Sequence, residues 1–475
     1  MTPQPKRSNP VLAACLEELG WSPKALARKL NKVFGPGTVA ESAPYHWRDS
    51  ARVPRSPLPV MTAYVLSQEL GRVVSVGELW QGRAPESPML IPASGGMELP
   101  WTAQGLWKIV EDWVVGGLID RRRFLAISGS GLSAVVAHYL DGTAGRGIYL
   151  SQGMPDTGEA SLIEQIETQL PQLQTLDDKH GGARHLGYIG AQFRSIGLLL
   201  HEGGYSGAVT ARLLRALAEV GQLAGWMAFD ATHHGLAQRY FVTALRAAHQ
   251  VNDLPLCAHV LADLSFQAAS RDHPADAITL GEAARRASDA APAAVRASVL
   301  SRLAFAYATA GRYMDFQRSR TLARELIDEP LTGYEPRWMY FLTPNHLDCQ
   351  AGYALVHLGM VQKHDGITAK GRTLLGQGID LLQTGAHDRS QETAHQRRAL
   401  YEGAWLALGN SARGELESAC QIGEVAAERL TTVRSPRSAD LLRRLATDLR
   451  RRQRNPYVRS FLPRLEQALQ ATNRG

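Results

Sequence analysis

The residues near the start of the chain that are best suited to bind a ligand are basic and aromatic, and they lie in the stretch SAPYHWRDSARVPRSP, residues 42–57. Arg48 and Arg52 each carry a guanidinium group, a rigid fork of donors that fits a guanine edge or a phosphate. Tyr45 and His46 lie just before them and add further hydrogen-bonding groups. We therefore interpret these four side chains as candidates for contact with a nucleic acid.

Three further cations, Lys24, Lys29 and Arg55, flank this stretch. We expect them to contact phosphates, which set the position of a protein on a duplex without reading its sequence. The distribution of charge agrees, because residues 1–83 hold 11 Lys and Arg against 6 Asp and Glu, a net of +5 in a chain whose formal charge is +7. A basic region of this kind indicates contact with a polyanion.

The C-terminal region is basic as well. Residues 434–475 hold 11 Arg against 3 acidic residues, a net of +8, so the middle of the chain carries a net of −6. Two interpretations stay open for this arginine-rich run: a second contact with a polyanion, or a terminal pair of helices whose basic faces are solvated.

The sequence holds no strong signature of catalysis, of a cofactor or of a metal site. It lacks the phosphate-binding pattern GxxxxGK[ST] and the zinc pattern HExxH. GSGLSA at residues 129–134 matches the loose glycine fingerprint of dinucleotide sites, but its surroundings read as helical, so we expect close helix packing there. His233 and His234 would point about 100° apart on a helix, which favours capping or packing. We therefore predict that the protein is not an enzyme and holds no cofactor or metal.

The basic residues have to be positioned by short helices. The sequence predicts five such helices before residue 83. Asn9 and Ser22 are suited to cap the first two, each with a proline in the first turn. Ser42 can cap the third, which carries the basic residues, and Trp47 is then the inward-facing anchor of that helix.

This region resembles the lambda-repressor-like, or XRE-type, helix-turn-helix domain. Recognition helices of that family often read W-E-x-G-x-x-x-P, and here residues 47–54 read W-R-D-S-A-R-V-P. The following PVMTAYVLSQELGRVVSVGELWQG, residues 59–82, is similar to the last two helices of the family. The resemblance covers residues 10–82 and implies a bracing helix at residues 22–34 and a recognition helix at residues 42–50 that enters the major groove.

The match departs from the family's pattern in two ways. The turn between the second and third helices is longer than the usual three or four residues. The glycine that the family places after the recognition helix is also missing here. Both departures concern how the domain docks on DNA rather than how it folds.

Beyond residue 82 the composition changes. The stretch RAPESPMLIPASGGMELP, residues 83–100, is rich in Pro, Gly and Ser and reads as a linker. Residues 101–158 are predicted to form a helical connecting segment, with two helices followed by a loop from about residue 141.

From residue 159 to residue 470 the chain reads as repeated pairs of helices. Three related loops lie about 39 residues apart, and they read DATHHGLAQ (230–238), SRDHPADA (270–277) and TAGRYMDF (309–316). A repeat of this length built from helix pairs predicts an α-solenoid of tetratricopeptide-like units, because one pair cannot bury its apolar stripe alone. The predicted fold class is therefore all-α throughout.

The whole layout resembles actinobacterial cytoplasmic regulators that join such a helix-turn-helix domain to tetratricopeptide-like repeats. The resemblance implies a transcriptional regulator that binds double-stranded DNA, acts as a homodimer, and senses a peptide, small molecule or protein on the concave face of its repeats. The alternative is an interaction scaffold of tetratricopeptide-like repeats that does not bind DNA directly.

Some aromatic residues of the repeat region could contact a ligand on the concave face. Most fall at helical spacing beside Ala and Leu and are predicted to be core, while a few could line the concave face. Sequence alone does not separate the two groups, whose members are Trp226, Phe229, Tyr240, Phe241, Tyr307, Tyr313, Tyr340 and Trp405.

The cysteines and the apolar runs of the sequence bear on the cellular compartment of the protein. The four cysteines are far apart and form no CxxC, which fits a reducing compartment. No apolar run approaches the roughly 20 residues needed to span a bilayer, and the start of the chain lacks the apolar stretch of a signal peptide. We predict a cytoplasmic, nucleoid-associated protein without a membrane partner.

Overall fold

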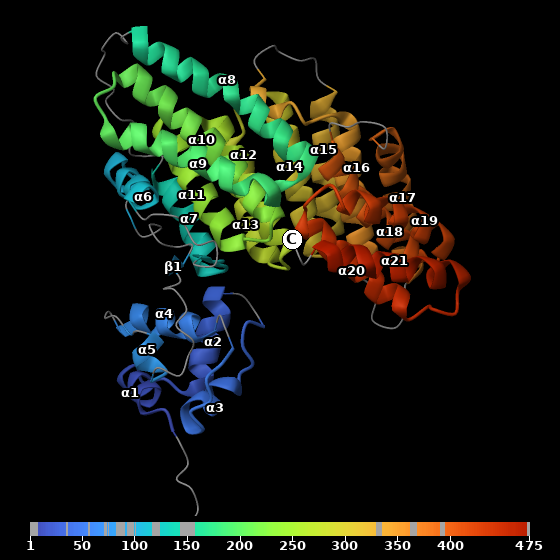
Figure 1. The fold of residues 1–475 in the computed structure, drawn as a ribbon, viewed down its shortest axis with the longest axis horizontal. Helices are drawn as coiled ribbons and strands as arrows, with labels where there is room; N and C mark the ends of the chain where they lie inside the picture. The colour runs from blue at the N-terminus through green and yellow to red at the C-terminus, as the bar shows by residue number, and fades with distance from the viewer. Residues whose placement is uncertain are drawn as a thin grey trace, which may run out of the picture. The chain divides into compact units, whose positions relative to one another are not determined.

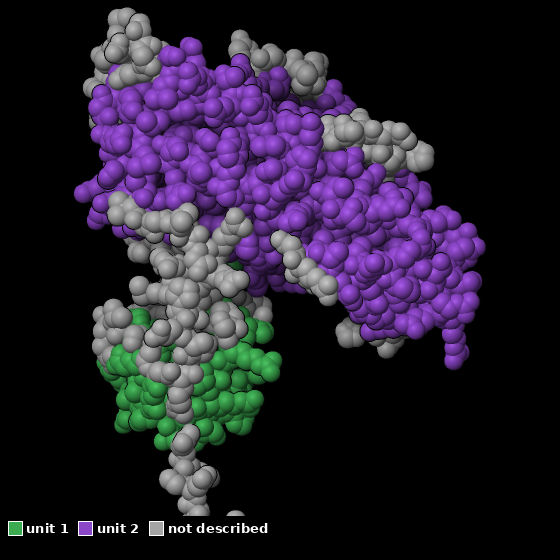
Figure 2. Space-filling view, viewed as in Figure 1, with its two compact units in different colours: residues 1–98, 118–135 green, residues 99–117, 136–475 purple. Residues whose placement is uncertain are grey.

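A computed structural model describes residues 8–34, 37–55, 58–70, 74, 76–81, 91–92, 99, 101–115, 124–142, 157–328, 335–361, 368–389 and 395–472. Its architecture is all-α, as the sequence predicted, apart from one pair of two-residue strands. The chain divides into two compact units (Figure 2). The first, called the head, comprises residues 1–98 and 118–135, and the second, called the body, comprises residues 99–117 and 136–475.

In the described residues before residue 83, the head forms five helices at the places that the sequence indicated (Figure 1): α1 (Pro10–Glu18), α2 (Pro23–Phe34), α3 (Ala43–Asp49), α4 (Leu58–Leu70) and α5 (Val76–Leu79). The Asn9 side chain caps α1 by accepting from the backbone N–H of Leu12 at 3.0 Å. The Ser22 hydroxyl accepts from the N–H of Ala25 at 3.2 Å, at the start of α2. The third predicted cap is wrong, because the Ser42 side chain makes no capping bond to α3.

The head is organised around leucines from α1, α2 and α4 and two indoles. Trp47 from α3 lies edge-on against Trp80, with ring centroids 6.0 Å apart. Trp80 donates its indole N–H to the carbonyl of Pro59 at 3.1 Å, so it satisfies its one polar group inside the core. Asn9 joins the same centre by donating from Nδ2 to the carbonyl of Leu79 at 2.9 Å.

A later part of the chain returns to the head. Strand β1 (Ile91–Pro92) pairs in parallel with β2 (Phe124–Leu125), and the N–H of Ser128 donates to the carbonyl of Val33 at the end of α2. Gly129 follows with a φ of +63°, and a Cβ there would lie 2.7 Å from the Lys32 carbonyl oxygen. The first glycine of GSGLSA is thus required for close approach to α2 rather than for packing inside a helix, and it precedes α7 (Ser130–Gly142).

Two predicted segments fall mainly outside the described residues. Of the expected linker at residues 83–100, the structure describes residues 91–92 and 99. Of the expected loop from residue 141 to 158, it describes only the end of α7 and the start of the next helix. The division between head and body lies within α7.

The body is a succession of helices stacked in sequence order (Figure 1). They are α6 (Ala103–Val115), the second half of α7, α8 (Thr157–His180), α9 (Gly182–Glu202), α10 (Gly207–Asp230), α11 (His234–Gln250), α12 (Leu254–Ser270), α13 (Pro274–Ala287), α14 (Ala293–Thr309), α15 (Tyr313–Ile327), the short 3₁₀ helix η2 (Arg337–Met339), α16 (Pro344–Val361), α17 (Ala369–Arg389), α18 (Gln396–Arg413), α19 (Leu416–Leu430), α20 (Pro436–Arg450) and α21 (Pro456–Thr472). Helices α10 to α19 pack as consecutive pairs, which confirms the predicted helical repeat.

A shared turn explains why the three loops look alike in sequence. Thr232, Asp272 and Gly311 occupy equivalent places and adopt positive φ angles of 61°, 58° and 73°. The next residue in each case donates its N–H to the carbonyl five residues earlier, at 2.8, 3.0 and 2.9 Å. This bond and the left-handed residue are the marks of a Schellman motif at a helix C-terminus. Asn252 and Gly414 close two further helices in the same way.

The body curves until its contacts close into a ring. The even-numbered helices are the inner ones, and each packs on the next from α10 through α12, α14, α16 and α18 to α20. Helix α20 also contacts α10, and α18 contacts α8. The two ends of this succession of inner helices are therefore in contact with each other. None of the helices in the described part of the chain is both long and apolar enough to cross a membrane.

Candidate functional site

Most of the candidate DNA-contact residues of the head lie on and just after α3, a short helix with defined structure at both ends. Pro44 stands in its first turn, and Ala51 adopts a φ of +49° after its last turn. The backbone N–H of Arg52 then bonds the carbonyl of His46 at 3.2 Å. Ala51 thereby adopts the left-handed conformation that glycine usually supplies. The N–H of Asn9 bonds the Arg48 carbonyl at 2.8 Å and holds the same end in place.

Two side chains of α3, those of Pro44 and Trp47, are buried, whereas several others are exposed. Trp47 is 4% exposed and is packed in the head core. Tyr45 is 39% exposed, and His46 and Arg52 are exposed as well, as is Arg55. This surface therefore offers hydrogen-bonding side chains to solvent while the indole fixes the helix from behind.

The remaining candidates already have acidic partners within the head. Lys24 lies 2.6 Å from the Glu41 carboxylate, and Lys29 lies 2.6 Å from that of Glu69. Arg48 is half-buried and pairs with its neighbour Asp49 at 2.6 Å, while its guanidinium carbon lies 5.6 Å from the centroid of the Tyr45 ring. The bond from Arg48 lowers the pKa of the Asp49 carboxyl.

One cation of this surface was missed by sequence reasoning. Arg28 shares Glu41 with Lys24, and its Nε lies 3.4 Å from that carboxylate. Lys24 and Arg28 are four residues apart and so lie on one face of α2, whereas Lys29 lies about 100° further round. The spacing of four from Lys24 is the signal that identifies Arg28. The predicted phosphate contacts thus fall on two sides of α2.

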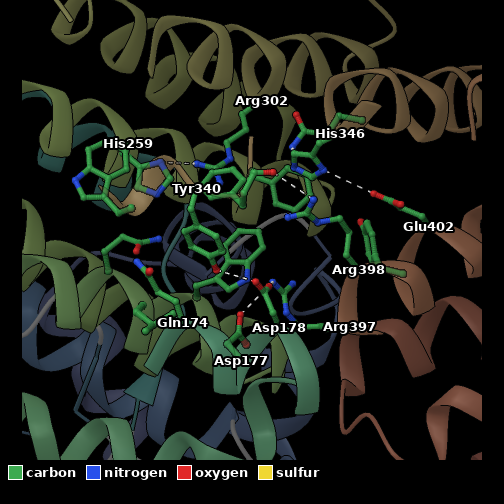
Figure 3. A pocket seen from close by; sticks show the side chains of 18 of the residues that line it. Gln174, Asp177, Asp178, His259, Arg302, Tyr340, His346, Arg397, Arg398 and Glu402 are labelled. Carbon is green, nitrogen blue, oxygen red and sulfur yellow. Dashed lines mark hydrogen bonds and ion pairs between the residues drawn. The ribbon is translucent and has the colours of Figure 1, made fainter. Parts of the chain in front are cut away.

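A second candidate site is a cavity inside the ring of the body (Figure 3). It encloses about 790 Å³ between atoms, counting space open to solvent. Residues from α8, α10, α12, α14, α16, α18 and α20 line it, together with the segment around η2. Most of these residues are buried, and aromatic and polar side chains alternate in the lining, as in small-molecule sites.

One wall of the cavity is an ion-paired corner between α8 and α18 (Figure 3). Arg397 Nη2 lies 3.0 Å from Asp177 and 3.1 Å from Asp178, and the Tyr340 hydroxyl donates to Asp178 at 2.8 Å. Burial raises the pKa of Asp177 to about 7, although Arg397 opposes the shift. Burial acts on Asp178 too, but a hydrogen bond with His395 and the charge of Arg397 outweigh it and lower the pKa of Asp178 to about 2.

The opposite wall holds a second network of buried polar groups. Arg302 pairs with Asp263 at 2.8 Å and donates to Nδ1 of His259 at 3.1 Å. Burial lowers the pKa of His259 well below its ordinary value, so the ring is neutral and can accept this bond. The imidazole stacks on Trp338 from η2, with centroids 4.6 Å apart. Gln222 completes the network by donating to Asp263 at 2.6 Å.

A third buried network joins the two ends of the ring. Asp230, at the end of α10, accepts from the Ser435 hydroxyl at 2.8 Å and from Arg437 of α20 at 3.2 Å. The Arg437 guanidinium lies over the Tyr401 ring, 4.2 Å from its centroid. The backbone N–H of Gly182 also donates to Asp230, at 3.2 Å.

The structure separates the aromatic residues that the sequence left undivided. Trp226 and Tyr340 line the cavity, while Tyr240 and Phe241 are buried between helices. Phe229 and Trp405 border a neighbouring hollow that shares Arg437 and Tyr401 with the cavity. Tyr307 is buried and Tyr313 is half-buried.

Sequence reasoning named none of the charged residues of the cavity. The signal that could have found them is a lone charge inside an otherwise apolar helix, as for Asp263 in LCAHVLADLSFQAA and Arg302 in VLSRLAFAYA. Buried charges are rare unless they are paired, so such positions point to a network. What the sequence does not show is that helices more than 200 residues apart bring charges of the cavity together.

The arginine-rich C-terminal run packs as the last pair of helices. Arg437 is buried against Asp230, and four further arginines form ion pairs with acids of the body, namely Arg443, Arg450, Arg452 and Arg464. These contacts favour the interpretation as a terminal helix pair. Within the described residues, no group of three or more His, Cys, Asp or Glu is arranged to hold a metal ion.

Comparison with known proteins gives one match. A family model described as the SP15 N-terminal domain matches residues 12–79, which lie within the head. Neither curated proteins nor solved structures gave a significant match to the chain.

Proposed function

We propose that the protein is a DNA-binding transcriptional regulator whose head contacts the duplex and whose body receives a signal. The observation that carries this proposal is the exposed surface of α3 and of the turn that follows it. Tyr45, His46 and Arg52 face solvent there, while Trp47 is buried on the opposite side. A short helix held from within by an indole can present these side chains to base edges. The net charge of +5 over residues 1–83 supplies the attraction to phosphate.

The ion pairs of the head are compatible with this role. Lys24 and Lys29 are paired with carboxylates at the surface, where such pairs contribute little to stability. A phosphate can take the place of the carboxylate at small cost, because both are oxyanions and the lysine stays solvated. Arg48 and Arg52 would then reach base edges, while Lys24, Lys29 and Arg55 would contact phosphates.

The body supplies the second half of the proposal. It would dimerise, so that two heads face half-sites about one helical turn apart. Its cavity would take up the signal that changes the regulator's state. This mode of action places the protein in the cytoplasm, at the nucleoid, without a membrane partner.

Chromatin immunoprecipitation with sequencing tests the proposal, followed by binding titrations on the enriched fragments. Arg48→Ala should reduce the preference for the enriched sequence, whereas Lys29→Ala should weaken binding to all duplexes alike. Arg318→Ala, which removes an exposed, ion-paired arginine of the body, is the matched control and should leave binding unchanged. A full-length protein that enriches no genomic sequence would overturn the assignment.

One observation favours the alternative of a protein-interaction scaffold. Three of the predicted DNA contacts, Lys24, Lys29 and Arg48, already have carboxylate partners in the head. If that pairing is permanent, the head is a bundle without a nucleic-acid surface. Recovery of one stoichiometric protein partner from nuclease-treated lysate, with no DNA enriched, would favour this reading.

A further inference from the structure

The inner face of the body forms a chamber that is partly open to solvent, which limits what can occupy it. The contacts of α20 with α10 and of α18 with α8 close the ring around the cavity. An open solenoid groove can take an extended chain that leaves at both ends. A chamber lined mostly by residues less than 10% exposed instead suits a single small molecule.

The charges of the chamber compensate one another. Four arginines line it, and each of three is ion-paired: Arg302 with Asp263, Arg397 with Asp177 and Asp178, and Arg437 with Asp230. The fourth, Arg398, donates to the carbonyl of Phe341 at 3.2 Å, and Glu402 adds a further carboxylate to the lining. A ligand with a full net charge would have to leave water without gaining an unopposed counter-charge. The chamber therefore favours a molecule without net charge.

Flat faces dominate the apolar part of the chamber. Trp226 projects from α10, and the guanidinium carbons of Arg302, Arg397 and Arg437 lie 5.5, 5.6 and 5.3 Å from its ring centroid. Phe266, Phe341 and Tyr353 add aromatic surface from other helices. Aromatic rings and guanidinium planes both stack on planar unsaturated groups.

Two buried polar atoms of the chamber's ion-paired corner lack a hydrogen-bond partner within the described residues. One is Oδ1 of Asp177 and the other is Nε of Arg397, on two side chains joined by an ion pair of 3.0 Å. Buried polar atoms are nearly always satisfied, so these two are available to bond with a molecule that enters the corner. An acceptor and a donor in the same corner complement the N–H and C=O of one amide.

We propose that the chamber binds a small, uncharged aromatic molecule that carries an amide-type group, with its ring on Trp226 and its amide at Asp177 and Arg397. Since this corner joins α8 to α18, the bound molecule bridges the two helices and stabilises the closed ring. Calling the molecule the signal rests on the proposed regulatory function, whereas its binding does not.

Three probes of one shape test the chemistry: naphthalene-2-carboxamide, naphthalene-2-carboxylate and naphthalene-2-methylamine, titrated into the full-length protein at pH 7.5 by calorimetry and ligand-observed NMR. The carboxamide should bind at least about tenfold more tightly than either charged analogue. Because no DNA is present, failure of DNA binding by the head would leave this result untouched.

Matched variants locate the binding. Gln174→Trp fills the chamber from α8 and should weaken carboxamide binding at least about tenfold, whereas Gln172→Trp, on the exposed face of the same helix, should bind like the unchanged protein. Trp226→Phe keeps an aromatic ring and should reduce the change in tryptophan fluorescence on binding, with Trp338 as the second tryptophan of the lining. Failure of all three probes to bind, tighter binding of a charged analogue, or full binding by Gln174→Trp would each overturn the proposal.

Discussion

An ion pair of the head and an ion pair of the body differ in how far they are exposed to solvent. In the head, the Lys24 and Glu41 side chains form an ion pair while remaining 44% and 52% exposed. In the body, the Arg437 and Asp230 side chains form one while only 9% and 0% exposed. The first kind of pair is solvated, weak and open to exchange, whereas the second is held by a network that must remain intact.

This difference indicates which parts of the molecule can change partner. A surface lysine gains little from its carboxylate and loses little when a phosphate replaces it. A buried arginine cannot leave its acid without stranding a charge, so it determines the shape of the structure around it. The head is therefore suited to contact a polyanion, and the body is suited to enclose a chamber of fixed shape.

The largest effect is expected where a buried pair of the body is broken. Asp230→Ala should lower the free energy of unfolding of the body by about 3–5 kcal/mol, because Arg437, Ser435 and the Gly182 N–H lose their acceptor inside the protein. Calorimetric unfolding of the full-length chain measures this change.

The matched control for this variant removes an exposed pair from the same region. Asp440→Ala breaks the i,i+3 pair with Arg443 on α20 and should change the stability by no more than about 0.5 kcal/mol. Equal losses in the two variants would contradict the contrast between buried and exposed pairs.

In the head, the largest polar effect should come from Asn9, which is fully buried. Asn9→Ala removes the cap of α1 and the bond to Leu79, and it should cost about 2 kcal/mol of head stability. Ser22→Ala, at the exposed cap of α2, should cost about 0.5 kcal/mol. Chemical denaturation monitored in the head region compares the two, and a larger loss for Ser22→Ala would refute the assigned role of Asn9.

A smaller, pH-dependent effect should come from Asp177. Burial raises the pKa of this carboxyl to about 7 in the folded protein, whereas its ordinary pKa of 3.8 applies in the unfolded chain. The folded state then binds the proton more tightly, so this group adds stability as the pH falls from about 7 to about 4 and removes it as the pH rises.

Comparison with Asp177→Asn isolates that contribution. Relative to this variant, the unchanged protein should gain about 1 kcal/mol per pH unit as the pH falls through that window. Denaturation midpoints measured at pH 4.5, 5.5 and 6.5 provide the test, and a difference between the two proteins that stays constant would show that Asp177 titrates normally.

The smallest effect on stability should come from Glu41, which is exposed and pairs with Lys24 and Arg28. Glu41→Gln should leave the unfolding midpoint unchanged but strengthen binding to duplex DNA, because two cations lose their internal competitor. Thr38→Gln, in the same loop, is the matched control for the new side chain. Weaker DNA binding by Glu41→Gln would mean that these cations do not face phosphate.

The sequence predicted the elements of this protein better than their assembly. Pro10, Pro23 and the caps at Asn9 and Ser22 act within a few residues, so they located the first two helices. The repeat was visible because Thr232, Asp272 and Gly311 mark the same turn at regular spacing. Local signals of this kind can be read from a single sequence, because they depend only on residues that are close together in the chain.

The chamber could not be predicted, because its residues meet only when the ring closes. Asp177 and Arg397 are 220 positions apart, and no pattern in one sequence links them. The curvature that closes the ring accumulates from small rotations between many helix pairs. The contact of Ser128 and Gly129 with the end of α2 could not be predicted for the same reason, because these residues lie far from α2 in the sequence.

The central claim is that the head binds DNA through exchangeable surface cations, and the salt dependence of binding tests it most directly. Fluorescence anisotropy of the full-length protein with a labelled duplex, from 50 to 300 mM salt, should show log K falling linearly with log salt. Lys24→Ala and Arg55→Ala should each reduce the slope by about one, whereas Arg318→Ala should not. No binding at 50 mM salt, or a slope unchanged by either head variant, would contradict the account.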